Sequence, residues 1–152
     1  MLKTGDKLPE FISKNQDGET VHSKSFLGKK LIVFFYPGAL TPTCTVEACN
    51  LRDFYKDLQA EGYQLVGISA DTVQKQKRFH DKNHFPFDLI ADESQEVVNL
   101  FGVWQLKKTF GKEYFGIVRT TFIFDQHGIC TRRIDKVTSK TAAQQILQPT
   151  EE

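Results

Sequence analysis

The amino-acid sequence predicts an α/β fold with a mixed central sheet flanked by helices. Apolar runs typical of buried strands alternate with segments typical of helices along most of the chain. Two strands joined by a tight turn close this series near the carboxyl end. Alternating strands and helices with a closing hairpin indicate a mixed sheet that is covered by helices.

The N-terminal half is expected to supply a hairpin, a buried strand and a long helix. The hairpin spans Phe11–Ser23 around the turn-forming residues 15–18. The run Leu31–Tyr36 is apolar throughout, as expected of a strand that is buried on both faces. A helix over about residues 42–61 follows, and Gly62 ends it.

The second half is expected to continue the alternation. Asp71 is a good N-cap for a helix that follows a strand over residues 63–69 and continues to about Asn83. The basic, irregular segment 104–116 is interpreted as a loop. The other expected elements are a short strand over 87–90, a helix over 93–101 closed by Gly102, a hairpin with strands over 118–124 and 129–134, and a last helix over about 139–148.

Length and charge bound the class of protein. The 152 residues are expected to form one domain over 1–152, which is large enough to fold without a structural disulfide. The net charge is +1 and like charges are not clustered, so neither nucleic acid nor a membrane is expected as a partner. The apolar runs are far shorter than the roughly 20 residues that span a bilayer. We therefore expect a soluble, untargeted protein of the cytoplasm.

Two of the three cysteines lie on the helix predicted from residue 42. Thr41 and Pro42 are typical of an N-cap and a first helical residue, so Cys44 falls in the first turn. Unpaired N–H groups and the positive end of the helix dipole favour a thiolate there. Cys44 is therefore a candidate nucleophile, with a buried and unreactive cysteine as the alternative. Cys49 lies five positions further on, and so few cysteines fit a reducing compartment.

The residues around Cys44 resemble a known family. The pattern Pro37-x-x-x-Thr41-x-x-Cys44, with Cys49 five residues later and Arg119 opening the run Arg-Thr-Thr-Phe-Ile-Phe-Asp, resembles the active site of the peroxiredoxins, in particular the peroxiredoxin Q or bacterioferritin comigratory protein subgroup. The resemblance extends from about Gly5 to Asp135. Further similar segments within it lie at 47–53, 85–92, 101–104 and 111–117. The resemblance implies a thioredoxin fold with an added N-terminal β-hairpin.

The resemblance also implies an activity and a role for each site residue. The protein would reduce hydrogen peroxide and organic hydroperoxides, with Cys44 as the peroxidatic nucleophile and no metal or organic cofactor. Arg119 would lie against Cys44 and stabilise the thiolate; on composition alone it would be an ordinary solvated charge. Thr41 would bind the peroxide, and the backbone N–H groups of Thr43 and Cys44 would hold its oxygens. Pro37 would shield the pocket. Thr43 departs from the family pattern, because glycine is frequent there.

Cys49 would resolve the oxidised nucleophile. In the implied cycle it forms an intramolecular disulfide with Cys44, which thioredoxin or a glutaredoxin reduces. On a helix, residues five apart rise about 7.5 Å and point about 140° apart, so this disulfide requires the first turns to unwind. Two other functions stay open: a disulfide reductase, against which the absence of C-x-x-C spacing argues, and a redox-sensing or holdase module that uses the same cysteine pair.

The remaining candidates are expected to be structural. Cys130 should pack in the closing hairpin, on one face with Ile134. Glu47 and Arg52 should hold the helix of Cys44 in register.

His80 and His84 have the spacing of a metal pair on a helix, but no third ligand is evident in the sequence. We therefore expect a solvated helix face and no metal site. A monomer or a weak homodimer is expected.

Overall fold

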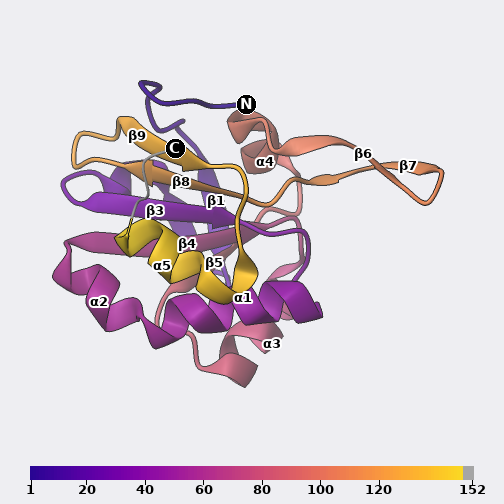
Figure 1. The fold of residues 1–152 in the computed structure, drawn as a ribbon, viewed down its shortest axis with the longest axis horizontal. Coiled ribbons are helices and arrows are strands. Elements are labelled where there is room, and N and C mark those ends of the chain that lie inside the picture. Colours follow the sequence, from indigo (N-terminus) through magenta and orange to yellow (C-terminus); the bar gives the residue numbers. More distant parts are fainter. Residues whose placement is uncertain (149–152) are drawn as a thin grey trace.

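The computed structural model describes residues 1–148, which form a seven-stranded sheet, a separate two-stranded sheet, and helices on both faces of the larger sheet (Figure 1). The order in the larger sheet is β2-β1-β5-β4-β3-β8-β9. Strands β3, β4 and β5 run parallel, and the outer pairs run antiparallel, so the predicted mixed sheet is confirmed. The strands are β1 (Ile12–Asn15), β2 (Thr20–His22), β3 (Lys30–Phe35), β4 (Tyr63–Ser69), β5 (Asp88–Ala91), β8 (Thr120–Phe124) and β9 (Cys130–Ile134).

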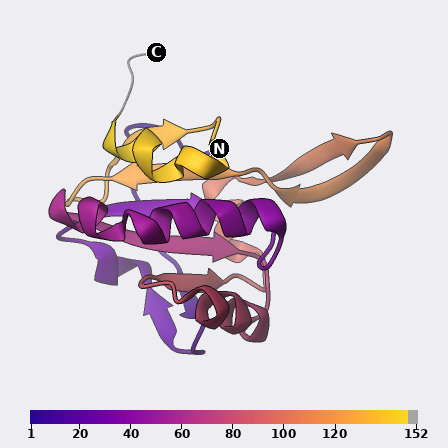
Figure 2. The ribbon, with the colours of Figure 1, turned by 60° about the horizontal axis from the view of Figure 1, so that its bottom comes forward.

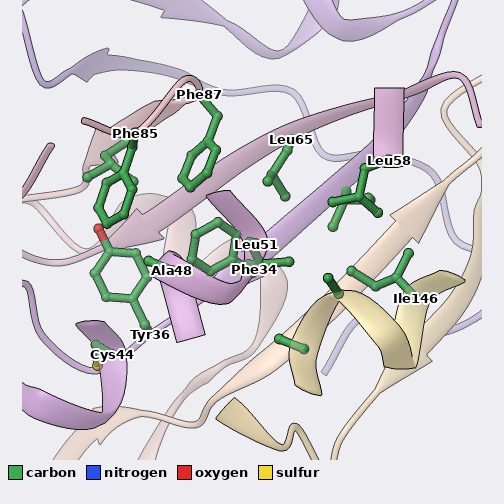
Figure 3. Packing of buried hydrophobic residues seen from close by; sticks show 14 of the residues in the cluster. Phe34, Tyr36, Cys44, Ala48, Leu51, Leu58, Leu65, Phe85, Phe87 and Ile146 are labelled. Carbon is green, nitrogen blue, oxygen red and sulfur yellow. The ribbon is translucent and has the colours of Figure 1, made fainter. Parts of the chain in front are cut away.

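Strand β3 separates two hydrophobic cores. Because side chains alternate along a strand, Ile32 and Phe34 point into a first core, while Val33 and Phe35 point into a second core. Helices α1 (Pro42–Asp53), α2 (Tyr55–Ala60), α3 (Val73–Asn83) and α5 (Ala142–Leu147) contribute to the first core, and α4 (Glu96–Phe101) contributes to the second. Both faces of β3 are covered, which explains the uninterrupted apolar run in its sequence. Figure 3 shows the first core, with Cys44 on the side of Tyr36.

The helix predicted over residues 42–61 is interrupted. It consists of α1 (Pro42–Asp53) and α2 (Tyr55–Ala60), with Phe54 between them at φ −105° and ψ 14°. The backbone bonds continue through the break, since the N–H of Phe54 donates to Asn50 and its carbonyl accepts from Leu58. The break is therefore a local distortion, and Phe54 packs against the first core there. Neither Pro nor Gly marks this position, so nothing in the local sequence indicated the break.

Helix α3 (Val73–Asn83) begins one residue later than expected. Its N-cap is Thr72, whose hydroxyl accepts from the N–H of Lys75 at 3.1 Å. The prediction that Asp71 caps this helix is wrong, because its carboxylate binds elsewhere. The helix ends at His84, which has a left-handed backbone with φ 51°.

Helix α4 (Glu96–Phe101) also begins later than the predicted residue 93. Gln95 has φ 65°, which prevents the helix from starting earlier. The buried carboxylate of Asp92 then accepts hydrogen bonds from the N–H groups of Val97 and Val98, at 3.2 and 2.8 Å. Gly102 ends the helix with φ 74°, as predicted.

The segment interpreted as a loop is a β-hairpin, made of β6 (Trp104–Thr109) and β7 (Lys112–Ile117). It projects from the body of the molecule, which both ribbon views show (Figures 1 and 2). Its turn residues Phe110 and Gly111 have φ 51° and 76°, as tight hairpins require. Most of the hairpin is exposed on both faces. The alternation of polar and apolar residues that identifies a half-buried strand is therefore weak in its sequence.

The closing hairpin contains a bulge that the sequence did not predict. The consecutive β8 residues Ile123 and Phe124 pair with Arg132 and Cys130, so β9 has one extra residue between these two partners. One extra residue inverts the alternation of side chains, and Cys130 therefore lies in the second core while Ile134 packs against the first. The prediction that these two residues share a face is wrong. A 3₁₀ turn over Ser139–Thr141 and helix α5 (Ala142–Leu147) follow, where a last helix was predicted.

Candidate active site

Cys44 lies in the first turn of α1, at the carboxyl end of β3. The N-cap Thr41 has an extended backbone, with φ −76° and ψ 151°, and Pro42 is the first helical residue. The first N–H groups of a helix lack partners within the helix, so they and the helix dipole favour an anion at this position. The side chain of Cys44 is only 2% exposed. The candidate nucleophile is thus recessed rather than on the open surface.

Arg119 reaches Cys44 through the sheet. Phe35, at the end of β3, pairs with Thr120 at the start of antiparallel β8, so the residue before Thr120 lies beside the carboxyl end of β3. From there, Nη2 of Arg119 donates a hydrogen bond to Sγ of Cys44 at 3.3 Å. The two residues are 75 positions apart in the sequence. Strand pairing therefore creates this contact.

The other side of the guanidinium binds Glu47. Nη1 of Arg119 donates to Oε1 of Glu47, whose side chain is fully buried. Burial raises the pKa of Glu47 to about 7, although the adjacent guanidinium opposes the rise. Burial by itself would lower the pKa of Arg119, but Glu47 and Cys44 together raise it above its ordinary value. Arg119 is thus a permanent cation that is held between a carboxylate and a thiol.

Glu47 was expected only to hold the helix in register, and its contact with Arg119 was not foreseen. The one available signal was its position three residues after Cys44, which places both side chains on one face of α1. Within residues 1–148, its second oxygen, Oε2, is buried without a hydrogen-bond partner.

Thr41, Pro37 and Thr43 form an exposed rim beside the recessed thiol. Although Thr41 occupies the N-cap position, its side chain does not cap the helix. Its hydroxyl instead donates to the carbonyl of Gly38 at 2.8 Å. The expected N-cap position is confirmed, but the side-chain cap is not formed, because the hydroxyl is directed to the Gly38 carbonyl and not to the N–H groups of the first turn.

Cys49 is half-buried on α1, where its Sγ donates to Oδ1 of Asn83 at 3.6 Å. Burial raises the pKa of Cys49, with Arg52 opposing and Asp53 adding to the rise. Helix α1 is continuous through Cys44 and Cys49, so their side chains point in different directions. Both are free thiols.

Comparison with known proteins identifies the family. The family model described as the AhpC/TSA family matches residues 4–133. The chain belongs to the AhpC/TSA family. Its sequence is 45% identical over 127 residues to Peroxiredoxin Bcp of Escherichia coli, which covers 84% of this chain and 81% of that protein.

Solved structures give the same relationship. Peroxidoxin BcpB from Mycobacterium tuberculosis has a TM-score of 0.85 at 33% identity, covering 97% of this chain and 95% of that one. The bacterioferritin comigratory protein of Xanthomonas campestris, which has alkyl peroxide reduction activity, has a TM-score of 0.86 at 26% identity, covering 93% and 95%. The fold of this chain is therefore the thioredoxin-like fold of the peroxiredoxins, and the chain is a thiol-dependent peroxidase of the two-cysteine type.

Within residues 1–148, Cys130, His80 and His84 form no hydrogen bond with Cys44 or Arg119. Cys130 is buried, with its Sγ directed to the carbonyl of Arg132 at 3.5 Å, and burial raises the pKa of this thiol. His80 lies 3.2 Å from the carboxylate of Asp81, while His84 lies beyond the end of α3. No group of three or more His, Cys, Asp or Glu residues within residues 1–148 could hold a metal ion.

The same part of the chain contains no helix that is both long and apolar enough to cross a membrane.

Proposed function

We propose that Cys44 is the nucleophile of this peroxidase. The observation that carries the proposal is the 3.3 Å contact between Nη2 of Arg119 and Sγ of Cys44, in the first turn of α1. The Cys44 thiolate attacks one oxygen of the peroxide, and the oxygen–oxygen bond breaks. The attacked oxygen stays on sulfur as a sulfenic acid, and the other leaves as water or an alcohol after it takes up a proton. Arg119 stabilises both the thiolate and the charge that develops on the leaving oxygen.

The rim residues would orient the peroxide. The hydroxyl proton of Thr41 is used by Gly38, so the oxygen of Thr41 is left to accept a hydrogen bond from the peroxide O–H. The N–H groups of Thr43 and Cys44, in the unpaired first turn of α1, would donate to the peroxide oxygens. Pro37 would limit the access of water. An exposed rim admits organic hydroperoxides as well as hydrogen peroxide.

Cys49 would resolve the sulfenic acid. Its thiol displaces the sulfenic oxygen as water and forms the Cys44–Cys49 disulfide, and a thioredoxin-like dithiol protein then reduces this bond while its own thiols are oxidised. Because α1 is helical through both cysteines, the residues between them must unwind. We place the cycle in a reducing compartment such as the cytoplasm, with the protein acting as a monomer or a weak homodimer.

Polar contacts hold the segment that must unwind. On one side, Nη1 of Arg52 donates to the carbonyl of Asn83 at 2.9 Å. On the other side, the Asn50 side chain donates to the carbonyl of Lys140 at 3.0 Å and accepts from the N–H of Ala143 at 2.8 Å. Formation of the disulfide would therefore disturb the ends of α3 and α5 as well as α1.

Intact-mass analysis after one equivalent of peroxide tests the proposal. The wild type should lose the two thiol hydrogens as the disulfide forms, and Cys49→Ser should instead gain one oxygen. Cys44→Ser should keep its mass, and Cys130→Ser, the matched control, should behave like the wild type. Wild-type peroxide reactivity in Cys44→Ser would refute the assignment.

A steady-state assay separates this function from the two alternatives. A disulfide reductase or a redox-controlled holdase would not consume peroxide catalytically with a thioredoxin system. Sustained turnover by the wild type, lost in Cys49→Ser, supports the two-cysteine cycle.

A further inference from the structure

Pro37 and Thr41 of the proposed peroxide-binding rim lie on a loop whose backbone is strained. Residues 37–41 connect β3 to α1, and Leu40 in this loop has φ 67°. Bulky side chains rarely adopt this left-handed conformation, which persists only where the surroundings hold it. Leu40 directly precedes Thr41, so the strain lies next to a proposed peroxide ligand. Contacts that hold this loop therefore matter for the site.

The side chain of Asp71 holds this loop from outside. Oδ2 of Asp71 accepts the N–H of Ala39, the residue before Leu40, at 2.7 Å. The same oxygen accepts the hydroxyl of Ser69 at 2.7 Å. Asp71 is not needed as an N-cap, because Thr72 caps α3. Its carboxylate instead links the end of β4 to the middle of the loop.

Buried hydrogen bonds fix the position of this carboxylate. Oγ of Ser69 accepts from Nε2 of Gln76 at 2.8 Å, and the same amide group donates to the carbonyl of Ile90 at 2.8 Å. Oε1 of Gln76 accepts from the hydroxyl of Tyr36 at 2.5 Å. Ser69, Gln76 and Tyr36 are all 0% exposed. Burial raises the pKa of Tyr36, so it stays a neutral donor.

These hydrogen bonds connect the residue before the loop with the residue that binds its middle. Tyr36 directly precedes the loop, and Asp71 binds its middle, while Gln76 of α3 joins the two through Ser69. Networks of buried hydrogen bonds in which each member is paired are rigid. The loop is thus fixed to the carboxyl ends of β3 and β4 rather than to solvent.

Lys75 offers a control variant, because it forms an ion pair with Asp71. Its ammonium group lies 3.2 Å from Oδ1 of Asp71, whereas the bonds to Ala39 and Ser69 both use Oδ2. The Lys75 side chain is 43% exposed, so this ion pair is screened by water and contributes little. Removing Lys75 therefore tests this ion pair separately from the contact of Asp71 with the loop.

We propose that Asp71 is a positioning residue of the peroxide pocket, which acts by holding the N–H of Ala39 and thereby the placement of Thr41 and of the first turn of α1. This inference rests on the proposed function of Cys44. It predicts an effect on the reaction with peroxide, whose oxygens must be oriented, that is larger than the effect on a reagent that needs only an accessible thiolate.

The test compares two reagents on one thiol. In a Cys49→Ser, Cys130→Ser background only Cys44 can react, and the second-order rate constants with hydrogen peroxide and with iodoacetamide are measured. Asp71→Ala should lower the peroxide rate about 10- to 100-fold and the iodoacetamide rate less than about threefold. Asp71→Asn, which keeps an oxygen that can accept from Ala39, should retain most of the peroxide rate. Lys75→Met should leave both rates unchanged.

Several outcomes would overturn the proposal. Equal slowing of both reagents in Asp71→Ala would show a general loss of Cys44 reactivity. A loss of peroxide rate in Asp71→Asn as large as in Asp71→Ala would show that the charge of Asp71 matters and the bond to Ala39 does not. If Asp71→Ala does not fold, hydrogen exchange in the wild type decides, because an Ala39 amide that exchanges as fast as free loop amides contradicts the proposal. A background protein that does not react with peroxide would refute the function of Cys44 as well, whereas normal reactivity with no effect of Asp71→Ala refutes only this inference.

Discussion

Arg119 forms an ion pair with the buried Glu47, and the same guanidinium also donates to the Cys44 thiol. The pair joins the start of β8 to the first turns of α1. A planar fork of donors can serve two acceptors at once, which an ammonium group cannot do with the same geometry. The reactivity of the Cys44 thiol therefore depends on a cation that is also paired with the buried Glu47 carboxylate.

Replacing Arg119 should slow the attack on peroxide. Arg119→Met removes the donor to Cys44 and leaves the buried Glu47 without its cation, so we expect a loss of about 100-fold or more in the second-order rate constant. Arg119→Lys should recover little of this loss. Stopped-flow measurement of single-turnover oxidation checks both variants. Wild-type rates in Arg119→Lys would show that the fork geometry is unimportant.

Glu47 should make stability depend on pH. Its pKa is raised from 4.5 to about 7 in the folded protein, so between these values the folded state binds more protons than the unfolded state. Stability should therefore fall as pH rises from about 4.5 to 7, by up to about 3 kcal/mol, and stay level above pH 7. Urea unfolding of the wild type and of Glu47→Gln across this range measures the free energy of unfolding of each protein. As pH rises, the wild type should lose stability relative to Glu47→Gln. The exposed Glu61→Gln is the control, and an equal change there would contradict the assignment.

Oxidation should unwind α1 and loosen α5. In the reduced protein the amides of about residues 46–52 should be protected from hydrogen exchange, and in the disulfide form they should exchange faster. Because Asn50 binds the N–H of Ala143, the start of α5 should lose protection together with α1. Hydrogen-exchange mass spectrometry of both redox states checks this. Equal protection of α1, with a Cys44–Cys49 bond confirmed by peptide mapping, would contradict the unwinding.

Cys130 should matter for stability but not for turnover. It is 1% exposed in the second core, so Cys130→Ser places a hydroxyl where a thiol packs among apolar groups. We expect a loss of about 1–3 kcal/mol in the free energy of unfolding and an unchanged peroxidase rate. Urea unfolding and steady-state assays measure the two quantities. A lower rate at full stability would show a role for Cys130 in the reaction.

Features encoded by neighbouring residues were predictable from the sequence. The apolar run of β3, the Thr41-Pro42 start of α1 and the placement of Cys44 in its first turn all depend on local patterns, namely side-chain burial, backbone preference and helix capping. The motif around Cys44 and Arg119 also led to the family, which the comparisons confirm.

Features that depend on residues far apart in the chain were not predictable in this way. The bulge that places Cys130 and Ile134 in different cores arises from the pairing of β8 with β9, and the exposed β6–β7 hairpin has little apolar periodicity to reveal it. The local sequence predicts that Asp71 caps the nearest helix, but the fold brings the N–H of Ala39 within 2.7 Å of its carboxylate.

The place of the candidate nucleophile and the family of the chain can be recognised from the sequence, because both depend on short motifs. The surroundings of Cys44 depend on the tertiary structure. The ion pair of Arg119 with Glu47 and the hydrogen bond from the N–H of Ala39 to Asp71 form because parallel and antiparallel pairing bring the ends of β3, β4 and β8 together at one edge of the sheet.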